Sequence, residues 1–217
     1  GLVGSEMCIR DRLNDDRMQA KFVAQRIRDL IEEGTDPNEI AVLYRAHFHS
    51  MELQMELTRG EIPFRITSGI RFFEQAHIKD VVAFMRFVVN PRDELSFRRM
   101  VMLLPGIGPG MAQKLWIRWA ACPESRLETP PESFSALMLD FPVPAKSKTA
   151  WTQLCYTLDE LAPAGKIAGP ASMLISINEA VYDEYMQAAF ENYDQRRQDL
   201  LHLAGFSERF ESTEDFL

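Results

Sequence analysis

The sequence is poor in cysteine and has no excess of positive charge. Its 217 residues include three cysteines, Cys8, Cys122 and Cys155, which lie far apart. This odd, scattered set fits neither a disulfide framework nor a CxxC zinc site, so it predicts a reducing compartment, with the cytoplasm as the default. The 24 lysines and arginines are outnumbered by 32 aspartates and glutamates, which gives a net charge of −8. Any nucleic-acid site must therefore be local, because the molecule as a whole repels polyanions.

Long apolar runs and complete catalytic motifs are also missing. No run approaches the roughly 18 apolar residues that a membrane span requires, so no membrane partner is expected. The sequence contains no GxxxxGK[ST], no convincing pair of catalytic carboxylates and no Ser-His-Asp set. The hydrophobic content of 46% and the charged content of 26% are typical of a folded globular chain. The sequence thus predicts one or two folded domains that hold no complete active site.

The two ends of the sequence suggest an internal fragment. Residues 1–12 read GLVGSEMCIRDR, which has no helical or strand period and resembles the in-frame translation of a transposase adapter. We therefore leave this segment out of the fold prediction. At the other end, Ser212 is followed by an acidic stretch typical of a helical first turn, so a helix is expected to begin where the sequence stops.

Residues 13–67 are predicted to form part of an α/β domain. Helical spacing covers 15–33, and the apolar run 40–44 (IAVLY) indicates a strand buried on both faces. A second helix is expected over 50–59 and a second extended run over 63–66. Because two strands cannot complete a doubly wound sheet, this stretch is expected to be a partial domain built on a parallel sheet.

Residues 68–217 are predicted to form a mainly α-helical domain. After Gly69 the pattern is almost entirely helical, and hardly any β-type run remains. Proline and small residues separate the expected helices. These helices cover residues 78–89, 95–104, 110–121, 131–140, 147–161, 170–189 and 193–204.

The most specific local motif is LPGIGPGM, residues 104–111, between two amphipathic helices. This pattern predicts a helix-hairpin-helix, in which Gly106 and Gly108 let backbone amides and the next helix N-terminus approach a phosphate. Such a site binds the DNA backbone rather than a base sequence. An ordinary tight αα-turn is the alternative. A dinucleotide-binding GxGxxG is rejected, because a helix rather than a strand precedes the glycines and Gly110 comes one residue too early.

Three further features are less specific. His47 and His49 follow the predicted strand, but no Cys, Asp or Glu accompanies them in a metal-ligand spacing, so no metal is expected. Tyr44 and Arg45 at the same strand end suit either a nucleic-acid contact or a structural ion pair. Charge is segregated: residues 65–99 carry +3 and residues 111–217 carry −7, so DNA is expected to meet the first half.

Three ordered strings then resemble one protein family. The strings IAVLYRAHFHSMELQMEL, IPFRITSGIRFFEQAHIKDVVAFMRFVVNP and RRMVMLLPGIG closely resemble superfamily 1A DNA helicases of the UvrD/PcrA/Rep group. The resemblance implies a partial RecA-like P-loop NTPase motor domain (2A) over 13–67 and a truncated helical accessory insert (2B) over 68–217. It also implies a parent that uses ATP and Mg²⁺ to move 3′ to 5′ on single-stranded DNA and to unwind duplex, with the ATP-binding residues outside this sequence.

The resemblance assigns roles to individual residues. His47 stands where the family usually has an asparagine, and Met111 replaces a usual hydroxyl residue. The implied hinge into the insert is made of Gly69, Arg71, Phe72 and Phe73. The implied DNA contacts are Tyr44, Arg45, His47, Lys79, Gly106, Ile107, Gly108, Gly110 and Met111.

Two other readings stay open at this point. A free-standing helix-hairpin-helix module would bind DNA without any motor. A nuclease-fused relative of the same superfamily would carry a further domain downstream. The coding sequence upstream of this chain would distinguish the helicase hypothesis from the free-standing module. Only a helicase motor requires a GxxxxGK[ST] motif before Leu13.

Overall fold

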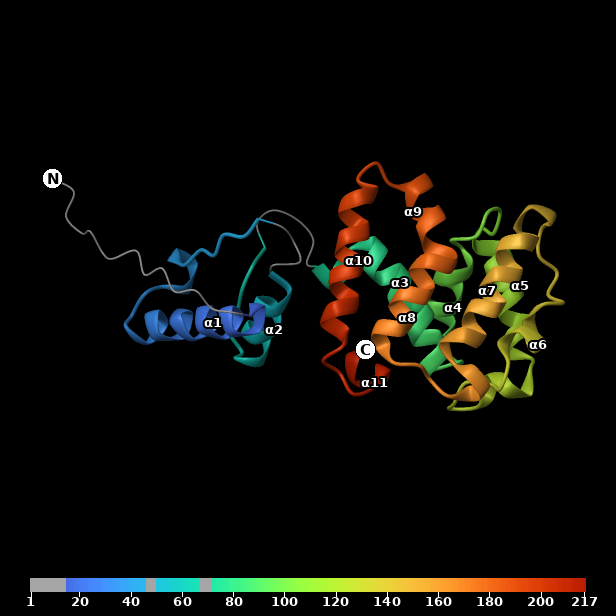
Figure 1. The fold of residues 1–217 in the computed structure, drawn as a ribbon, viewed down its shortest axis with the longest axis horizontal. Helices are drawn as coiled ribbons and strands as arrows, with labels where there is room; N and C mark the ends of the chain where they lie inside the picture. Colours follow the sequence, from blue (N-terminus) through green and yellow to red (C-terminus); the bar gives the residue numbers. More distant parts are fainter. Residues whose placement is uncertain (1–14, 46–49, 67–71) are drawn as a thin grey trace. The chain divides into compact units, whose positions relative to one another are not determined.

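The structure is a computed structural model that describes residues 15–45, 50–66 and 72–217. The expected adapter segment, residues 1–12, lies outside these ranges together with Cys8. The chain divides into two compact units, Gly1–Phe72 and Phe73–Leu217, and each is considered by itself (Figure 1). Among the described residues, no helix is both long enough and apolar enough to cross a membrane.

Unit 1 is built around a pair of helices. The described elements are α1 (Asp16–Glu32), η1 (Pro37–Glu39) and α2 (Met51–Arg59). Asp15 caps α1 by accepting a hydrogen bond from the Arg17 amide at 2.7 Å, which satisfies one of the free amides of the first turn. The buried core consists of Ala24 and Ile27 of α1 with Leu57 and Ile62. The two amphipathic faces expected from the sequence therefore bury each other.

The predicted strands, and with them the partial RecA-like α/β motor domain, are not found. No residue of the described ranges belongs to a strand. In the run 40–44, Leu43 is 95% exposed, whereas a strand buried on both faces would hide it. Ile40 and Phe64 pack instead against the α1–α2 core. The prediction was wrong because β propensity is realised only when a neighbouring strand offers a hydrogen-bonded ladder, and apolar residues without one serve the nearest core.

Unit 2 is helical, as the sequence predicts for this part of the chain. Figure 1 shows its helices packed around one another in several layers. Its elements, together with the turn η3 that spans the division between the units, are η3 (Phe72–Glu74), α3 (Ala76–Val89), α4 (Glu94–Val101), α5 (Pro109–Ala120), η4 (Pro123–Arg126), α6 (Phe134–Met138), η5 (Ala145–Ser147), α7 (Lys148–Leu161), η6 (Pro163–Gly165), α8 (Pro170–Ile177), η7 (Asn178–Tyr182), α9 (Asp183–Ala189), α10 (Tyr193–Ser207) and α11 (Thr213–Phe216).

An aromatic cluster joins the first four long elements of unit 2. The ring of Phe87 on α3 lies 5.2 Å from that of Phe97 on α4, 5.5 Å from that of Trp119 on α5 and 5.6 Å from that of Phe134 on α6. All four side chains are fully buried. The Trp119 indole donates a hydrogen bond to the Pro91 carbonyl at 2.8 Å, so its polar atom is satisfied inside the core. This packing fixes the orientation of α4 and α5 within unit 2, and with it the position of the turn that joins them.

The helix predicted over 170–189 is interrupted by a π-helical segment, η7. Helical periodicity alone does not reveal such a change of winding, which adds one residue to a turn. The segment directs the Tyr182 hydroxyl to Asp80 Oδ2 at 2.7 Å, while Arg99 Nε donates to Asp80 Oδ1 at the same distance. Burial, reinforced by the Asp80 carboxylate, raises the pKa of Tyr182 far above its usual value. Asp80 thereby ties α3 to α4 and to η7.

Candidate nucleic-acid interface

The turn between α4 and α5 buries its hydrophobic residues and exposes its glycines. Leu104 and Ile107 are each only 4% exposed, and the Ile107 amide donates to the Leu104 carbonyl at 3.2 Å. Gly106 and Gly108 lie on the outside. Gly106 has φ +80°, a left-handed conformation that favours glycine. The turn is thus anchored by two apolar side chains and offers its backbone to the solvent.

The N-terminus of α5 has no side-chain cap. Gly108 is the N-cap residue and makes no side-chain hydrogen bond, and Pro109 opens the helix. The first amides of a helix have no intrahelical acceptor, and the helix dipole places about half a positive charge there. A Cβ added at Gly108 or at Gly110 would meet nothing within 4 Å. These glycines are therefore not required by packing inside unit 2, and open space adjoins them.

Lys146 lies against the turn between α4 and α5, which is called the hairpin from here on. The sequence analysis did not predict this contact. A Cβ built on Gly106 would lie 1.9 Å from Lys146 Cε and 3.0 Å from its Nζ. The neighbouring Ser147 donates a hydrogen bond from Oγ to the Pro105 carbonyl. Ser147 of η5 thus holds the turn by a hydrogen bond, and the Lys146 side chain lies beside Gly106. The only sequence signal was that Lys146 and Lys148 flank the predicted start of a helix.

Lys79 lies at the same end of the α3–α4 pair as the hairpin. It is exposed in the first turns of α3. Near the C-terminal end of α4, Arg99 donates to Asp80 and also to the Ala76 carbonyl at 3.3 Å, so the start of α3 lies beside the end of α4, from which the hairpin follows. Among the described residues, neither Lys79 nor Lys146 forms an ion pair. Both ammonium groups are thus available to an anion.

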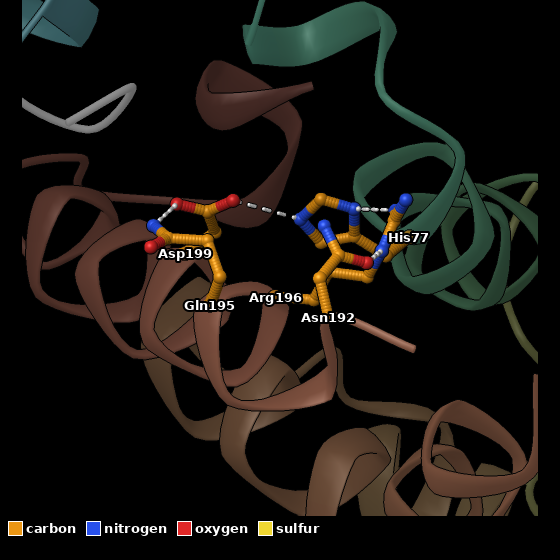
Figure 2. A network of polar contacts seen from close by, with 5 residues as sticks. All are labelled: His77, Asn192, Gln195, Arg196 and Asp199. Atoms are coloured by element: carbon orange, nitrogen blue, oxygen red, sulfur yellow. Dashed lines mark hydrogen bonds and ion pairs between the residues drawn. The ribbon is translucent and has the colours of Figure 1, made fainter. Parts of the chain in front are cut away.

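A buried polar network holds the start of α3 in place (Figure 2). The His77 ring is fully buried, and its Nδ1 lies 2.8 Å from Arg196 Nη1 of α10. Because a guanidinium can only donate, Nδ1 must accept, and the ring proton of the neutral imidazole lies on Nε2. That atom is 3.2 Å from Asp199 Oδ2. Arg196 in turn donates from Nε to Asn192 Oδ1 at 2.8 Å.

Of the other residues assigned from the resemblance, two belong to unit 1 and three lie outside the described ranges. Tyr44 is half-buried and Arg45 is exposed, both in unit 1. His47, Gly69 and Arg71 lie outside the described residues.

The two phenylalanines of the implied hinge are packing residues. Phe72 is fully buried. The ring of Phe73 lies 6.3 Å from that of Phe206 on α10. Met111 is half-buried in the first turn of α5, so its backbone rather than its side chain belongs to the hairpin surface.

Comparison with known proteins agrees with the resemblance. The family described as UvrD-like helicase C-terminal domain matches residues 3–123, more than half of the chain. The chain is 42% identical over 83 residues to DNA helicase II of Haemophilus influenzae, which covers 38% of this chain and 11% of that protein. It is 40% identical over 85 residues to the ATP-dependent DNA helicase UvrD1 of Mycobacterium tuberculosis, with 38% and 11% covered.

A third relative gives the same proportions. The chain is 37% identical over 83 residues to DNA helicase II of Escherichia coli, with 38% of this chain and 12% of that protein covered. The chain therefore matches only about a tenth of the length of these curated relatives. The predicted family is confirmed.

Proposed function

Because the chain belongs to the UvrD-like helicase C-terminal domain family, we propose that it is a DNA-contacting part of an ATP-dependent 3′–5′ DNA helicase. The intact parent would move along single-stranded DNA and unwind duplex in repair or replication. Within this chain, residues 68–217 would be the accessory insert that meets the duplex. The observation that supports this best is the exposed glycine hairpin with the Lys146 side chain beside it.

We further propose that the nucleotide site lies in other parts of the parent protein. No three of their His, Cys, Asp and Glu side chains are grouped so that they would hold a metal ion. The sequence also lacks the GxxxxGK[ST] loop that cradles phosphates. In this proposal ATP and Mg²⁺ would bind elsewhere in the parent, and the residues of this chain would bind and orient DNA.

The hairpin would grip one phosphate through two kinds of positive charge. The free amides at the start of α5, which has no side-chain cap, would supply hydrogen-bond donors with the helix dipole behind them. Lys146 adds a full charge beside Gly106, and Lys79 adds a second one at the same end of the helix pair. No base edge is involved, so binding would be independent of sequence. A motor that translocates past every sequence needs a contact of this kind.

A salt titration tests the proposal. Binding of the chain to a short duplex with a 3′ single-stranded tail is followed by fluorescence anisotropy at several salt concentrations. Each lysine that neutralises one phosphate contributes about 0.9 to the slope of log affinity against log salt. We expect Lys146→Ala and Lys79→Ala each to weaken binding and to flatten the slope by about that amount.

Lys166→Ala is the matched control. Lys166 is exposed beyond the far end of α7, and the 14 residues of α7 span about 21 Å. This variant should keep both the affinity and the slope of the unmodified chain. Arg45→Ala tests the proposed single-strand contact in unit 1 in the same way, with an unpaired oligonucleotide. An unchanged slope for Lys146→Ala and Lys79→Ala would refute the proposed hairpin contact.

A further inference from the structure

The hairpin belongs to a part of the chain that contains no acidic residue. Residues 95–123 and 141–158 together carry six basic and no acidic side chains, although the whole chain has a net charge of −8. The hydrogen bond from Ser147 to the Pro105 carbonyl joins these two segments within unit 2. Their basic side chains therefore lie in one region, and the positive potential extends beyond the glycine turn.

A regular row of positions leads from the hairpin along α5. Gly110, Lys114 and Arg118 recur at every fourth residue, so they lie on one side of the helix. All three are exposed, whereas Leu115 and Trp119, which face the core, are fully buried. Neither Lys114 nor Arg118 forms an ion pair among the described residues. Both cations are thus available to an anion.

A stack of aromatic rings holds the Arg118 guanidinium in place. The guanidinium carbon lies 5.2 Å from the centroid of the Phe141 ring, and that ring stacks on Trp151 with the ring centroids 5.9 Å apart. The Trp151 indole donates a hydrogen bond to the Met138 carbonyl at 2.9 Å, which fixes its ring. A guanidinium over an aromatic face is attracted to the ring, while the N–H groups at its edge stay free to bind a phosphate. Because Arg118 is already positioned, less ordering is needed when a ligand binds.

We propose that Arg118 binds a second backbone phosphate of the duplex, separate from the one at the hairpin. This inference rests on the proposed function, because it extends the same interface. Arg118 follows Gly110 by eight positions, which corresponds to about 12 Å along α5 and is too far for one phosphate group to serve both. Lys114 lies halfway between them and adds to the attraction. Because α5 fixes the spacing of the two contacts, they hold the duplex in one orientation, which a single contact cannot do.

The salt dependence of binding to the tailed duplex tests the inference. Arg118→Ala should flatten the slope of log affinity against log salt by about 0.9, so a fourfold rise in salt should weaken its binding about 3.5-fold less than that of the unmodified chain. The double variant Arg118→Ala, Lys146→Ala should lose about 1.8 in slope, because separate phosphates contribute additively. Arg197→Ala is the matched control. Arg197 is an exposed arginine of the acidic helix α10 that pairs with Asp183 at 4.0 Å, so its removal should not change the slope.

Replacement of Phe141 by leucine tests the positioning role of the ring. Leucine keeps an apolar side chain at this buried position but offers no aromatic face to Arg118. Phe141→Leu should weaken DNA binding about two- to fivefold, the range expected for one cation–π contact, and should keep the slope because the charge remains. In the Arg118→Ala background the same replacement should weaken binding no further. Urea unfolding of each variant measures the effect on the fold separately.

The possible outcomes separate this inference from the proposed function. If Lys146→Ala and Lys79→Ala flatten the slope but Arg118→Ala does not, the second phosphate contact is refuted and the hairpin contact stands. If Arg118→Ala alone flattens the slope, the hairpin contact is refuted and the contact at Arg118 stands. A double variant with the slope of either single variant would overturn the inference, because both side chains would then serve one phosphate. An equal loss for Phe141→Leu in both backgrounds would show that its role is purely structural, and absence of binding by the unmodified chain would overturn both proposals.

Discussion

Replacement of Gly106 by alanine should destabilise unit 2, and Gly108→Ala is its internal control. At φ +80° an alanine would adopt a left-handed conformation that costs roughly 1–2 kcal/mol. Its Cβ would also come within 1.9 Å of Lys146 Cε. Because Lys146 is an exposed and flexible chain, it can move aside, so the backbone conformation sets most of the cost. We therefore expect Gly106→Ala to lower the free energy of unfolding by about 1–2 kcal/mol.

The control variant, Gly108→Ala, makes the same change of residue type as Gly106→Ala, but at a position with a different backbone conformation and open surroundings. Gly108 has φ −94°, and a Cβ there meets nothing within 4 Å. Alanine at this position should change stability little, because the freedom that the unfolded chain loses opposes the poorer performance of alanine than glycine as an N-cap residue. Urea unfolding followed by tryptophan fluorescence measures both variants. The signal reports unit 2 alone, since Trp116, Trp119 and Trp151 all lie there.

The two variants also separate folding from binding. In Gly106→Ala the displaced lysine should no longer flank the turn, so adding Lys146→Ala should weaken DNA binding less than it does in the unmodified chain. Such non-additivity is expected for groups in direct contact. Equal stability of Gly106→Ala and Gly108→Ala would show that the geometry deduced for the hairpin is wrong. So would an equal loss of DNA affinity on adding Lys146→Ala to Gly106→Ala and to the unmodified chain.

Two further predictions concern the core of unit 2. Tyr182→Phe removes the donor to the buried Asp80 carboxylate and should lower the free energy of unfolding by about 1–3 kcal/mol, measured by urea titration; unaltered stability would contradict the assigned contact. Burial raises the pKa of Cys155 to about 12, so this thiol stays protonated in the folded state while the unfolded thiol ionises near its usual pKa. Stability should therefore fall by roughly 1 kcal/mol per pH unit from this group between about pH 9 and 12, and Cys155→Ala should remove that part of the decline; parallel curves would refute it.

The helices were predictable because each buries one face at a regular spacing. The expected helix over 15–33 is observed as Asp16–Glu32, and that over 147–161 as Lys148–Leu161. A shorter helix than expected forms within 131–140, because Asp159 of α7 accepts hydrogen bonds from the Phe134 and Ser135 amides and sets its start. That contact joins positions more than twenty residues apart, which local periodicity does not show.

The candidate site was predictable only in its local part. The glycine pattern predicted a turn between two helices, which is observed between α4 and α5, and Gly106 adopts a left-handed conformation there. Lys146 was missed because the contact depends on how α7 and η5 pack, 40 residues further along the chain. Similarly, the run 40–44 has strand-forming residues, but no described strand pairs with it. Residue propensities thus located the turn and the apolar run in the sequence. Which contacts these segments make depends on tertiary packing.

The distribution of charge gives unit 2 two different surfaces. Lys146 adjoins the hairpin and Lys79 lies at the same end of the α3–α4 pair, and neither forms an ion pair in the described part of the chain, whereas residues 170–217 carry a net charge of −7. A phosphate backbone would be attracted to the first and repelled from the second. Since the His77–Arg196 contact joins the start of α3 to α10, the two surfaces share one rigid framework.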